Sequence, residues 1–565
     1  MKDKILFILY NGSTIASYFG SPTLKYDSKK TDLELHEWLV FQLKKEEYKN
    51  IEKIVIPIYL GSEDYDFTGL RIGMHIRLSE ELGNKRYLPL IFLSEPSKED
   101  ILFEQVDDKK EKTATLLTTV NTKLVKMEVG AIQDAIDNFS EPLDEQKLKV
   151  EVLPKLIVEN QRDSNHQLAN EWGCFRLAKF EGLDLTETQK LPADLYFKYK
   201  YHLSGTNLKS TPIIPHDLST KDCKALLIDD NANTGWRQII EHTLKTQVTS
   251  GAIAVDTILS EADFNTKSEA DLLQYDVVYL DLRLVKNENH AKISDFSGAK
   301  ILKKIKAINR GVQVIVLTAS NKAWNMEHLL SEGADGYYIK ESPEMFVSDE
   351  FSKENYENLV ETSKKCLNRG YLKESFTKHQ IINNKIDSLL TLSSITTEKQ
   401  EFLKEAKIYF NMSFELLYTA SNETDNDNRK NKFGFAYLSL FKVVERINKY
   451  FKDASSLTSF PNYCFNESNL NDDPSSVGNY ATGRNLNRDA LKEFPTLSWI
   501  CIDLLSLSSH DLIRRIYWAI KRRNKFIHAD SSIEGEQKRE CRRIDNEDGY
   551  TDFLNILEKI ILQIP

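Results

Sequence analysis

The chain has 565 residues, 41% of them hydrophobic and 28% charged, and a formal net charge of −10. The length predicts three or more domains, and the balance of apolar and charged residues is typical of a globular protein. The acidic charge argues against general coating of nucleic acid, and no apolar run is long enough to cross a membrane.

Residues 1–106 predict an α/β domain that repeats the pattern of residues 221–345. In the later copy two strands end in acidic residues, but the aligned positions of the first copy hold Leu9, Tyr10 and Pro57. Proline also removes a backbone donor from its strand. We therefore expect the same fold without an acidic site. The aligned segments are Lys4–Asn11 with Lys224–Asn231, Lys53–Leu60 with Val277–Leu284, and Asp66-Phe-Thr-Gly69 with Asp295-Phe-Ser-Gly298.

Residues 107–220 predict a mixed, largely helical connector. Thr113–Phe139 is expected to be helical, and the fifth strand of the first domain lies either at Ile101–Val106 or later. Apolar residues at helical spacing over Asn165–Lys179 predict a surface or packing role, because no set of metal ligands accompanies them.

Residues 221–345 predict a second α/β domain whose strands end in polar residues. Short β-branched runs separated by helical patterns indicate βαβ units and a parallel sheet. Ligands of such sheets bind beyond the carboxyl ends of the strands, so these polar residues should converge on one site. They are Asp229, Asp230, Asp281, Thr318 and Lys340.

Three carboxylates and a lysine at one sheet edge indicate phosphoryl chemistry. The carboxylates repel one another, and a hard divalent cation with oxygen ligands relieves that repulsion. The cation, Thr318 and Lys340 would take up the oxygens of a phosphoryl group. Asp281 is then the expected nucleophile and phosphoacceptor, forming an acyl phosphate.

From its Asp-Asp pair to Gly333-Ala-Asp-Gly-Tyr-Tyr-Ile-Lys340, this stretch resembles the receiver domain of bacterial response regulators. The resemblance implies a two-component phosphorelay with a histidine kinase or phosphotransfer protein as partner. By the same resemblance, residues 1–106 are expected to be a pseudo-receiver that is not phosphorylated. The implied pocket has Mg²⁺ on Asp229, Asp230, Asp281 and the backbone carbonyl of Arg283, phosphate on Thr318 and Lys340, and Tyr337 as the aromatic switch residue.

Two features leave alternatives open. The receiver fold could be kept only as a scaffold, although its acidic pocket is intact. The loop Leu282–Ser297 is unusually long for a receiver and could cover the pocket or contact a partner. For His290 within it we expect plain solvent-facing surface.

Residues 346–400 predict a helical linker, with charged helices over Glu357–Tyr371 and Leu372–Leu392. We expect it to transmit a change from the receiver's last helix, through coiled-coil-like pairing.

Residues 401–565 predict an all-α bundle, because apolar residues recur at helical spacing. Asn422–Lys430 is expected to be a polar loop. Ser455–Asp489 is rich in Asn and Ser and is expected to be a mobile excursion. The expected helices are Glu401–Ala420, Lys432–Phe451, Leu491–Leu507, Asp511–Ile527 and Tyr550–Leu562.

The helix over Asp511–Ile527 leads into Arg523-Asn524-Lys-Phe-Ile-His528, in which Asn524 and His528 share a face. This motif resembles that of HEPN domains, small bundles marked by Arg-x4–6-His with a polar residue after the Arg. The resemblance implies a metal-independent endoribonuclease that works as a homodimer, without a cofactor in the bundle. Arg523, Asn524 and His528 would be catalytic, because histidine titrates near neutral pH and arginine binds a phosphorane. Glu445 is expected to pair with Arg523.

RNA would follow a basic stretch on the same helix, in an otherwise acidic protein. The alternative for the chain is a non-enzymatic signalling adaptor, whose bundle dimerises or binds a protein or nucleotide partner. Transcription control lacks support, because no helix-turn-helix or winged-helix pattern follows the receiver. The basic stretch is Arg514, Arg515, Lys521, Arg522 and Lys525, with Arg542 and Arg543 as a further extension.

The expected fold is therefore multidomain: two flavodoxin-like parallel-sheet domains followed by an all-α bundle. Six cysteines occur without a Cys-x-x-Cys pair, which fits neither a disulfide framework nor a zinc site. The N-terminus has no signal-peptide pattern, so we expect a cytoplasmic protein without a membrane partner.

Overall fold

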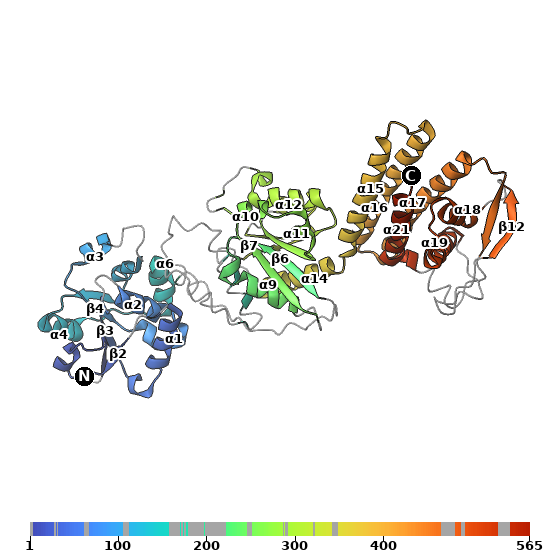
Figure 1. Ribbon diagram of the computed structural model, residues 1–565. Coiled ribbons are helices and arrows are strands. Elements are labelled where there is room, and N and C mark those ends of the chain that lie inside the picture. The colour runs from blue at the N-terminus through green and yellow to red at the C-terminus, as the bar shows by residue number, and fades with distance from the viewer. Residues whose placement is uncertain are drawn as a thin grey trace.

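The structure is a computed structural model, and Figure 1 shows two α/β units followed by a helical bundle. Among the helices of the described residues, none has both the length and the hydropathy of a membrane span. The described residues are 4–27, 30, 32–60, 67–104, 112–156, 170, 173–174, 177–178, 183, 197, 222–245, 251–285, 288, 292–319, 323–341, 349–464, 481–487, 492–528 and 543–565.

The first unit is built on a parallel sheet with the strand order β2-β1-β3-β4-β5, which is the order of flavodoxin-like folds. Successive side chains of a strand face opposite layers. Thus Leu6 and Ile8 pack in the core beneath α1 and α2, whereas Phe7 and Leu9 pack in the core beneath α4. The strands are β1 (Ile5–Tyr10), β2 (Thr23–Tyr26), β3 (Lys53–Pro57), β4 (Leu90–Leu93) and β5 (Thr122–Val125). The helices are η2 (Ile15–Tyr18), α1 (Asp32–Leu43), η3 (Glu46–Tyr48), α2 (Thr68–Leu78), η4 (Glu80–Tyr87), α3 (Lys98–Glu104), η5 (Lys112–Thr118), α4 (Val129–Asn138), α5 (Glu145–Lys147), η6 (Leu148–Val152) and α6 (Leu153–Leu156).

This unit extends past residue 106, so the predicted boundary was too early. The segment from Ile101 begins inside α3, and the fifth strand is β5, where Thr122 pairs with Leu90. The prediction of helix throughout Thr113–Phe139 was therefore wrong. A four-residue strand is too short to show an alternating pattern against its surroundings.

The central unit has a parallel sheet with the order β10-β9-β8-β6-β7, the same arrangement read from the other edge. Helices α9 and α14 share one apolar core with the sheet, and α10 to α13 share the core on its other face. The strands are β6 (Cys223–Ile228), β7 (Ile253–Ile258), β8 (Val277–Asp281), β9 (Gln313–Thr318) and β10 (Gly336–Ile339). The helices are η8 (Ala232–Thr234), α9 (Trp236–Lys245), α10 (Glu261–Asn265), α11 (Glu269–Leu273), η9 (Ile293–Asp295), α12 (Ser297–Ile308), α13 (Ala323–Ser331) and α14 (Asp349–Leu367).

Two glycines occupy equivalent places in the two units, as the predicted repeat requires. Gly69 begins α2 and lies against Pro57, whose carbonyl oxygen would be 1.9 Å from an added Cβ. Gly298 begins α12 and lies against Asp281, whose carbonyl oxygen would be 2.2 Å from an added Cβ. Both glycines therefore permit a helix to start against the end of the third strand of its unit, and the structure places Pro57 where the central unit has Asp281.

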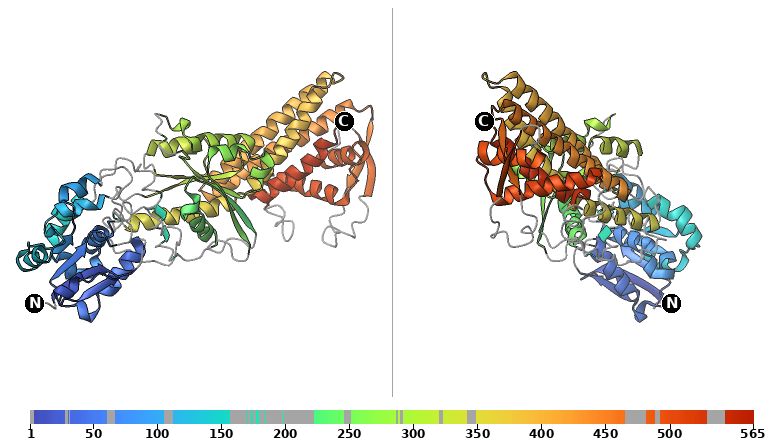
Figure 2. Two further views of the ribbon diagram at one scale, coloured as in Figure 1. Left: turned by 60° about the vertical axis from the view of Figure 1, so that its left-hand side comes forward. Right: turned by 90° about the vertical axis from the view of Figure 1, so that its right-hand side faces the viewer.

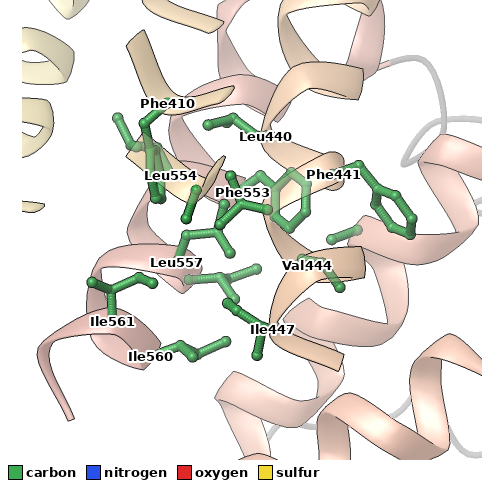
Figure 3. Packing of buried hydrophobic residues seen from close by; sticks show 14 of the residues in the cluster. Phe410, Leu440, Phe441, Val444, Ile447, Phe553, Leu554, Leu557, Ile560 and Ile561 are labelled. Atoms are coloured by element: carbon green, nitrogen blue, oxygen red, sulfur yellow. The ribbon is translucent and has the colours of Figure 1, made fainter. Parts of the chain in front are cut away.

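The third unit is a bundle of long helices around one apolar core (Figure 3). Phe441 and Val444 of α17 meet Phe553 and Leu557 of α21 there. Its elements are α15 (Tyr371–Leu390), α16 (Thr397–Asn422), α17 (Asn426–Ala454), β11 (Ser459–Cys464), β12 (Ala481–Asn487), α18 (Glu493–Trp499), η13 (Ile500–Leu504), α19 (His510–His528), η14 (Arg543–Asp545) and α21 (Glu547–Leu562).

Two predictions about the bundle are corrected. The stretch Asn422–Lys430 is mostly helical, because the Asp425 side chain caps α17 by accepting a bond from the Asn428 amide at 2.8 Å. The stretch Ser455–Asp489 contributes an antiparallel pair of strands, β11 and β12, rather than only irregular chain.

The predicted linker 346–400 is divided between two units. Helix α14 buries Tyr356 and Leu359 in the central core, whereas α15 buries Leu372 and Ile382 in the bundle core. The central unit therefore runs to Leu367, and only three residues separate α14 from α15. In the left view of Figure 2 the central sheet lies between the first unit and the bundle.

Further bonds join the central unit to α15. The Asn309 side chain donates to the Lys373 carbonyl at 3.0 Å, and Gln380 donates to the Ile308 carbonyl at 2.9 Å. The Lys373 ammonium donates to the Tyr275 carbonyl at 2.7 Å. These contacts lie at the amino-terminal ends of β8 and β9, and the acidic residues lie at the opposite, carboxyl-terminal ends of the strands.

Candidate functional site

The predicted polar cluster of the central unit is assembled. Asp281 ends β8, Thr318 ends β9, and Asp229 and Lys340 directly follow β6 and β10. One carboxylate oxygen each from Asp229, Asp230 and Asp281 lie within 4.8 Å of one another. Parallel strands with carboxyl ends at one edge bring these side chains together.

Lys340 is the buried cation of this cluster. Its Nζ donates to Asp229 Oδ2 at 2.8 Å and to Asp281 Oδ1 at 3.1 Å. Its backbone amide donates to the Thr318 carbonyl at 2.7 Å, which fixes the residue beside β9. Although burial alone would lower it, the pKa of Lys340 is raised by the charges of Asp229 and Asp281. Lysine is therefore held as the ammonium ion.

The three carboxylates carry more negative charge than one lysine neutralises. Burial raises the pKa of Asp281 to about 8, with Lys340 opposing the shift and Asp229 adding to it. Burial and the neighbouring Asp229 also raise the pKa of Asp230. A divalent cation with oxygen ligands would offset the free-energy cost of holding these buried carboxylates ionised, so the donor set fits Mg²⁺ or a similar hard ion.

The remaining predicted residues of this pocket lie near the same edge. Thr318 is buried, and Arg283 follows Asp281 by two residues with its guanidinium 4.9 Å from the centre of the Phe296 ring. Tyr337 in β10 is 39% exposed, so its ring is accessible at the surface of the unit.

The long loop after β8 is bonded to the first residue of α12 through Glu288. Glu288 accepts bonds from the Ser297 amide at 2.7 Å and the Ser297 hydroxyl at 2.8 Å. The same hydroxyl accepts from the Leu284 amide at 2.9 Å. His290 lies outside the described residues.

Sequence reasoning missed Asn170 and Trp236. The Asn170 Oδ1 accepts a bond from the Lys340 ammonium, and its backbone carbonyl accepts from the Trp236 indole at 3.2 Å. The Lys340 ammonium also lies 4.9 Å from the centre of the Trp236 ring. No local pattern signals these contacts, because they join residues far apart in the chain.

The predicted ion pair between Arg523 and Glu445 is present in the bundle. Arg523 Nη2 is 3.5 Å from Glu445 Oε1, and its guanidinium carbon is 4.8 Å from the centre of the Phe441 ring. Arg523 Nη1 also donates to Asn524 Oδ1 at 2.9 Å. His528 is the last residue of α19, and the structure describes its backbone only.

The predicted RNA-binding stretch is not one exposed surface. Arg522 is 1% exposed and bonds Asp552 at 2.7 Å, and Arg515 bonds the same carboxylate at 2.6 Å. Both arginines therefore join α19 to α21, and we withdraw them from the RNA-binding set. Three predicted members of the RNA-binding set remain. Arg514 lies 3.3 Å from Asp511, and the Nζ of Lys521 lies 5.4 Å from the centre of the Tyr517 ring. Of Lys525 the structure describes the backbone only.

A cleft of about 910 Å³ opens where α14 joins α15. Its walls include Lys365, Arg369 and Tyr371 from this junction, with Glu423 and Asp545 from the bundle. It lies apart from both clusters described above, because neither Asp281 nor Arg523 lines it.

Comparison with known families matches residues 4–125 to the inactive receiver domain. This match confirms the predicted pseudo-receiver, and it ends at Val125, the last residue of β5. Leu9, which aligns with Asp229, is buried in the apolar core of that unit, so its strand end has no carboxylate there. No curated protein matches the chain.

The chain is also similar to solved response regulators. One is a response regulator protein from Burkholderia pseudomallei with a phosphorylated aspartic acid, calcium ion and citrate. It is 18% identical in sequence, the match covers 25% of this chain and 75% of that chain, and the TM-score is 0.17. Another is a two-component system response regulator/GGDEF domain protein. It is 13% identical in sequence, the match covers 63% of this chain and 99% of that chain, and the TM-score is 0.15. Scores this low do not establish a shared fold, so the flavodoxin-like assignment rests on strand order.

Proposed function

We propose that the protein is a response regulator whose central unit is phosphorylated on Asp281. The observation that carries this proposal is the group of three carboxylates around Lys340 at the carboxyl edge of the sheet. The matched inactive receiver domain at 4–125 supports a role in phosphorelay signalling for the whole chain.

The phosphoryl donor would be a phosphohistidine of a kinase or phosphotransfer protein. A carboxylate oxygen of Asp281 attacks phosphorus, the P–N bond breaks with its electron pair going to the ring nitrogen, and the imidazole leaves neutral because its other nitrogen already carries a proton. Mg²⁺ bound by Asp229, Asp230, Asp281 and the Arg283 carbonyl would neutralise the phosphoryl oxygens. Lys340 and the Thr318 hydroxyl would bind those oxygens, and Tyr337 would respond as the switch residue.

Beryllofluoride mimics the phosphoryl group and tests this proposal. The full chain should bind it in the presence of Mg²⁺, and Asp281→Ala should not. Asp295→Ala is a matched control, because Asp295 is an exposed carboxylate on the same unit. Equal binding by wild type and Asp281→Ala would overturn the phosphorylation site.

Helices α14 and α15 would carry the response to the bundle. The support is their three-residue connection and the bonds of Asn309, Lys373 and Gln380 across the junction. A phosphoryl group can shift this junction only if it binds one arrangement better than the other. Hydrogen exchange over 345–400 should therefore change when beryllofluoride binds, and unchanged protection would contradict this route.

For the output we propose RNA cleavage by a HEPN-like dimer through Arg523, Asn524 and His528. The support is the Arg523 guanidinium, fixed by Glu445 and by Asn524 near the end of α19. His528 would exchange the proton of the attacking 2′-hydroxyl, and Arg523 would bind the phosphorane.

Purified protein should cleave RNA without metal, and both Arg523→Ala and His528→Ala should lose this activity. Lys407→Ala is a control for a charge change elsewhere, because Lys407 pairs with Asp387 on α15. Full cleavage by both active-site variants would exclude the ribonuclease.

The second candidate is a signalling adaptor whose bundle binds a protein or nucleotide. It is favoured by the engagement of Arg515 and Arg522 with Asp552, which shortens the basic stretch available to RNA. A dimer without RNA cleavage, whose partner binding responds to beryllofluoride, would support the adaptor.

A further inference from the structure

A segment that precedes the central unit lies against the acidic pocket. Asn170 is 0% exposed, and its side-chain oxygen accepts a bond from the ammonium of Lys340. Its backbone carbonyl accepts from the indole of Trp236 at 3.2 Å. The segment therefore reaches the same lysine that would bind a phosphoryl group.

Further residues anchor this segment beside α9. Residues 170, 173, 174, 177 and 178 have helical backbone, a spacing that places them on one face. Cys174 and Leu177 pack in the same apolar core as Trp236 and Tyr338. The Cys174 thiol donates to the Thr234 carbonyl at 3.4 Å. An added Cβ on Gly173 would lie 3.3 Å from the Trp236 ring, so the backbone passes directly over the indole.

The bonds of Lys340 leave no donor for another ligand. An ammonium group has three N–H donors. Three acceptors already surround it, on Asp229, Asp281 and Asn170. A phosphoryl oxygen must therefore replace one of them, and the neutral amide of Asn170 is the acceptor held least strongly, because the other two are charged.

The phosphoacceptor is shielded from solvent in this arrangement. Asp281 is 0% exposed in the structure in which Asn170 bonds Lys340. A phosphohistidine or a small phosphodonor must reach an oxygen of this carboxylate in line with its leaving group. The pocket in this arrangement is thus closed to the donor.

We propose that Asn170 is an inhibitory residue of the phosphorylation site, holding the place of a phosphoryl oxygen on Lys340. This inference rests on the proposed phosphorylation of Asp281. Phosphorylation then requires displacement of Asn170, and the phosphorylated pocket holds the segment in the released position. Because binding equilibria are reciprocal, a change that detaches the segment also favours the phosphoryl group. The segment lies between the first unit and the central unit in the chain, so its release changes the connection between them.

The test uses full-length protein, Mg²⁺ and beryllofluoride, with Asn170→Ala. We expect about tenfold tighter binding, the effect of one competing hydrogen bond to a charged group. Acetyl phosphate should also label Asp281 faster in this variant. Asn265→Ala is the matched control, since Asn265 is an exposed asparagine on the same unit, and its affinity should equal that of wild type.

A second variant leaves the pocket untouched. Leu177→Asp places a charge in the apolar anchor and should detach the segment, with the same gain in affinity. Hydrogen exchange of peptides covering 170–178 should rise in both variants without ligand. In wild type it should rise when beryllofluoride binds.

The outcomes separate the two proposals. If wild type binds beryllofluoride but neither variant binds more tightly and 170–178 stays protected, the role of Asn170 is overturned and the phosphorylation site stands. If none of the proteins binds beryllofluoride, both proposals fall together.

Discussion

The backbone of Gly311 in the central unit lies directly against the backbone of Leu372 in the bundle. A Cβ on this glycine would be 2.3 Å from the carbonyl carbon and oxygen of Leu372. Such a contact cannot be relieved by a side-chain rotation, because the two backbones touch directly at this point. The junction is therefore sensitive to a single methyl group.

Gly311→Ala should loosen the central unit from α15 and destabilise the protein by about 1–3 kcal/mol, the cost typical of an overpacked contact. Urea unfolding and hydrogen exchange over Lys373–Gln380 would measure the two effects. Gly130→Ala is the matched control, because Gly130 lies in α4 with no atom within 4 Å of an added Cβ. It should leave stability unchanged or raise it by up to about 1 kcal/mol. Equal stability of the two variants would contradict the tight junction.

Asp552→Asn should destabilise the bundle by about 3 kcal/mol, because it removes the carboxylate charge that bonds the buried Arg522. Burial opposes the shift, but Arg522 and Arg515 lower the pKa of Asp552 below its usual range. The stabilisation of the folded state by this ionised carboxylate is therefore present above the usual aspartate pKa. It is lost as the pH falls through the pKa that Asp552 has in the folded protein. Chemical unfolding would show the loss, while Asp511→Asn at an exposed carboxylate should change stability by less than about 0.5 kcal/mol. A smaller effect at Asp552 than at Asp511 would rule out a structural role for the pair.

His379 should make the bundle sensitive to acid. Burial lowers its pKa to about 3, and its Nε2 lies 2.7 Å from the Tyr550 hydroxyl, which is 2.9 Å from the Ser413 hydroxyl. In the neutral imidazole Nε2–H can donate to Tyr550, which donates to Ser413. A second proton would enter at Nδ1 of an imidazole that packs beside the Phe410 and Phe414 rings.

The folded state therefore binds fewer protons than the unfolded state between about pH 6.5 and about pH 3, and stability falls as pH falls through that window. The total loss should approach roughly 4 kcal/mol. Urea unfolding monitored by helical circular dichroism would measure it. His379→Gln should unfold more easily at neutral pH but lose less stability on acidification. An identical acid profile for the variant would assign the loss to other groups.

Mg²⁺ should stabilise the central unit, and its removal by a chelator should reverse the effect. At a concentration about 100-fold above Kd the gain is about 2.7 kcal/mol. Asp230→Asn removes one carboxylate of the cluster and should abolish the gain. Asp295→Asn, outside the cluster, should keep it. A magnesium effect of the same size in both variants would place the ion elsewhere.

The two sheets and the acidic pocket could be predicted because they depend on local patterns. The strand that ends at Asp281 was predicted because its first four residues, Val277–Leu280, form a continuous apolar run, the pattern of a strand buried on both faces. β7 was not predicted, because Asp256 and Thr257 interrupt its apolar residues.

The remaining features depend on contacts between distant residues. Nothing in the sequence distinguishes the arginines of α19 that form structural ion pairs from the other basic residues. The difference arises in the fold, where Arg515 and Arg522 pair with Asp552 on α21. The contact of Asn170 with Lys340 crosses 170 positions of the chain and follows no period. The division between α14 and α15 also escapes periodicity, since both helices are amphipathic and only their neighbours differ.

Trp236 lies between the two parts of the proposed switch, with its indole bonded to Asn170 and its ring beside the Lys340 ammonium. Departure of the segment would expose one face of the indole to water and remove its hydrogen-bond acceptor. The emission spectrum of this tryptophan should then shift to longer wavelength. With the other five tryptophans replaced by phenylalanine, the protein contains an intrinsic fluorophore from which the opening of the pocket can be followed in real time, without an attached dye.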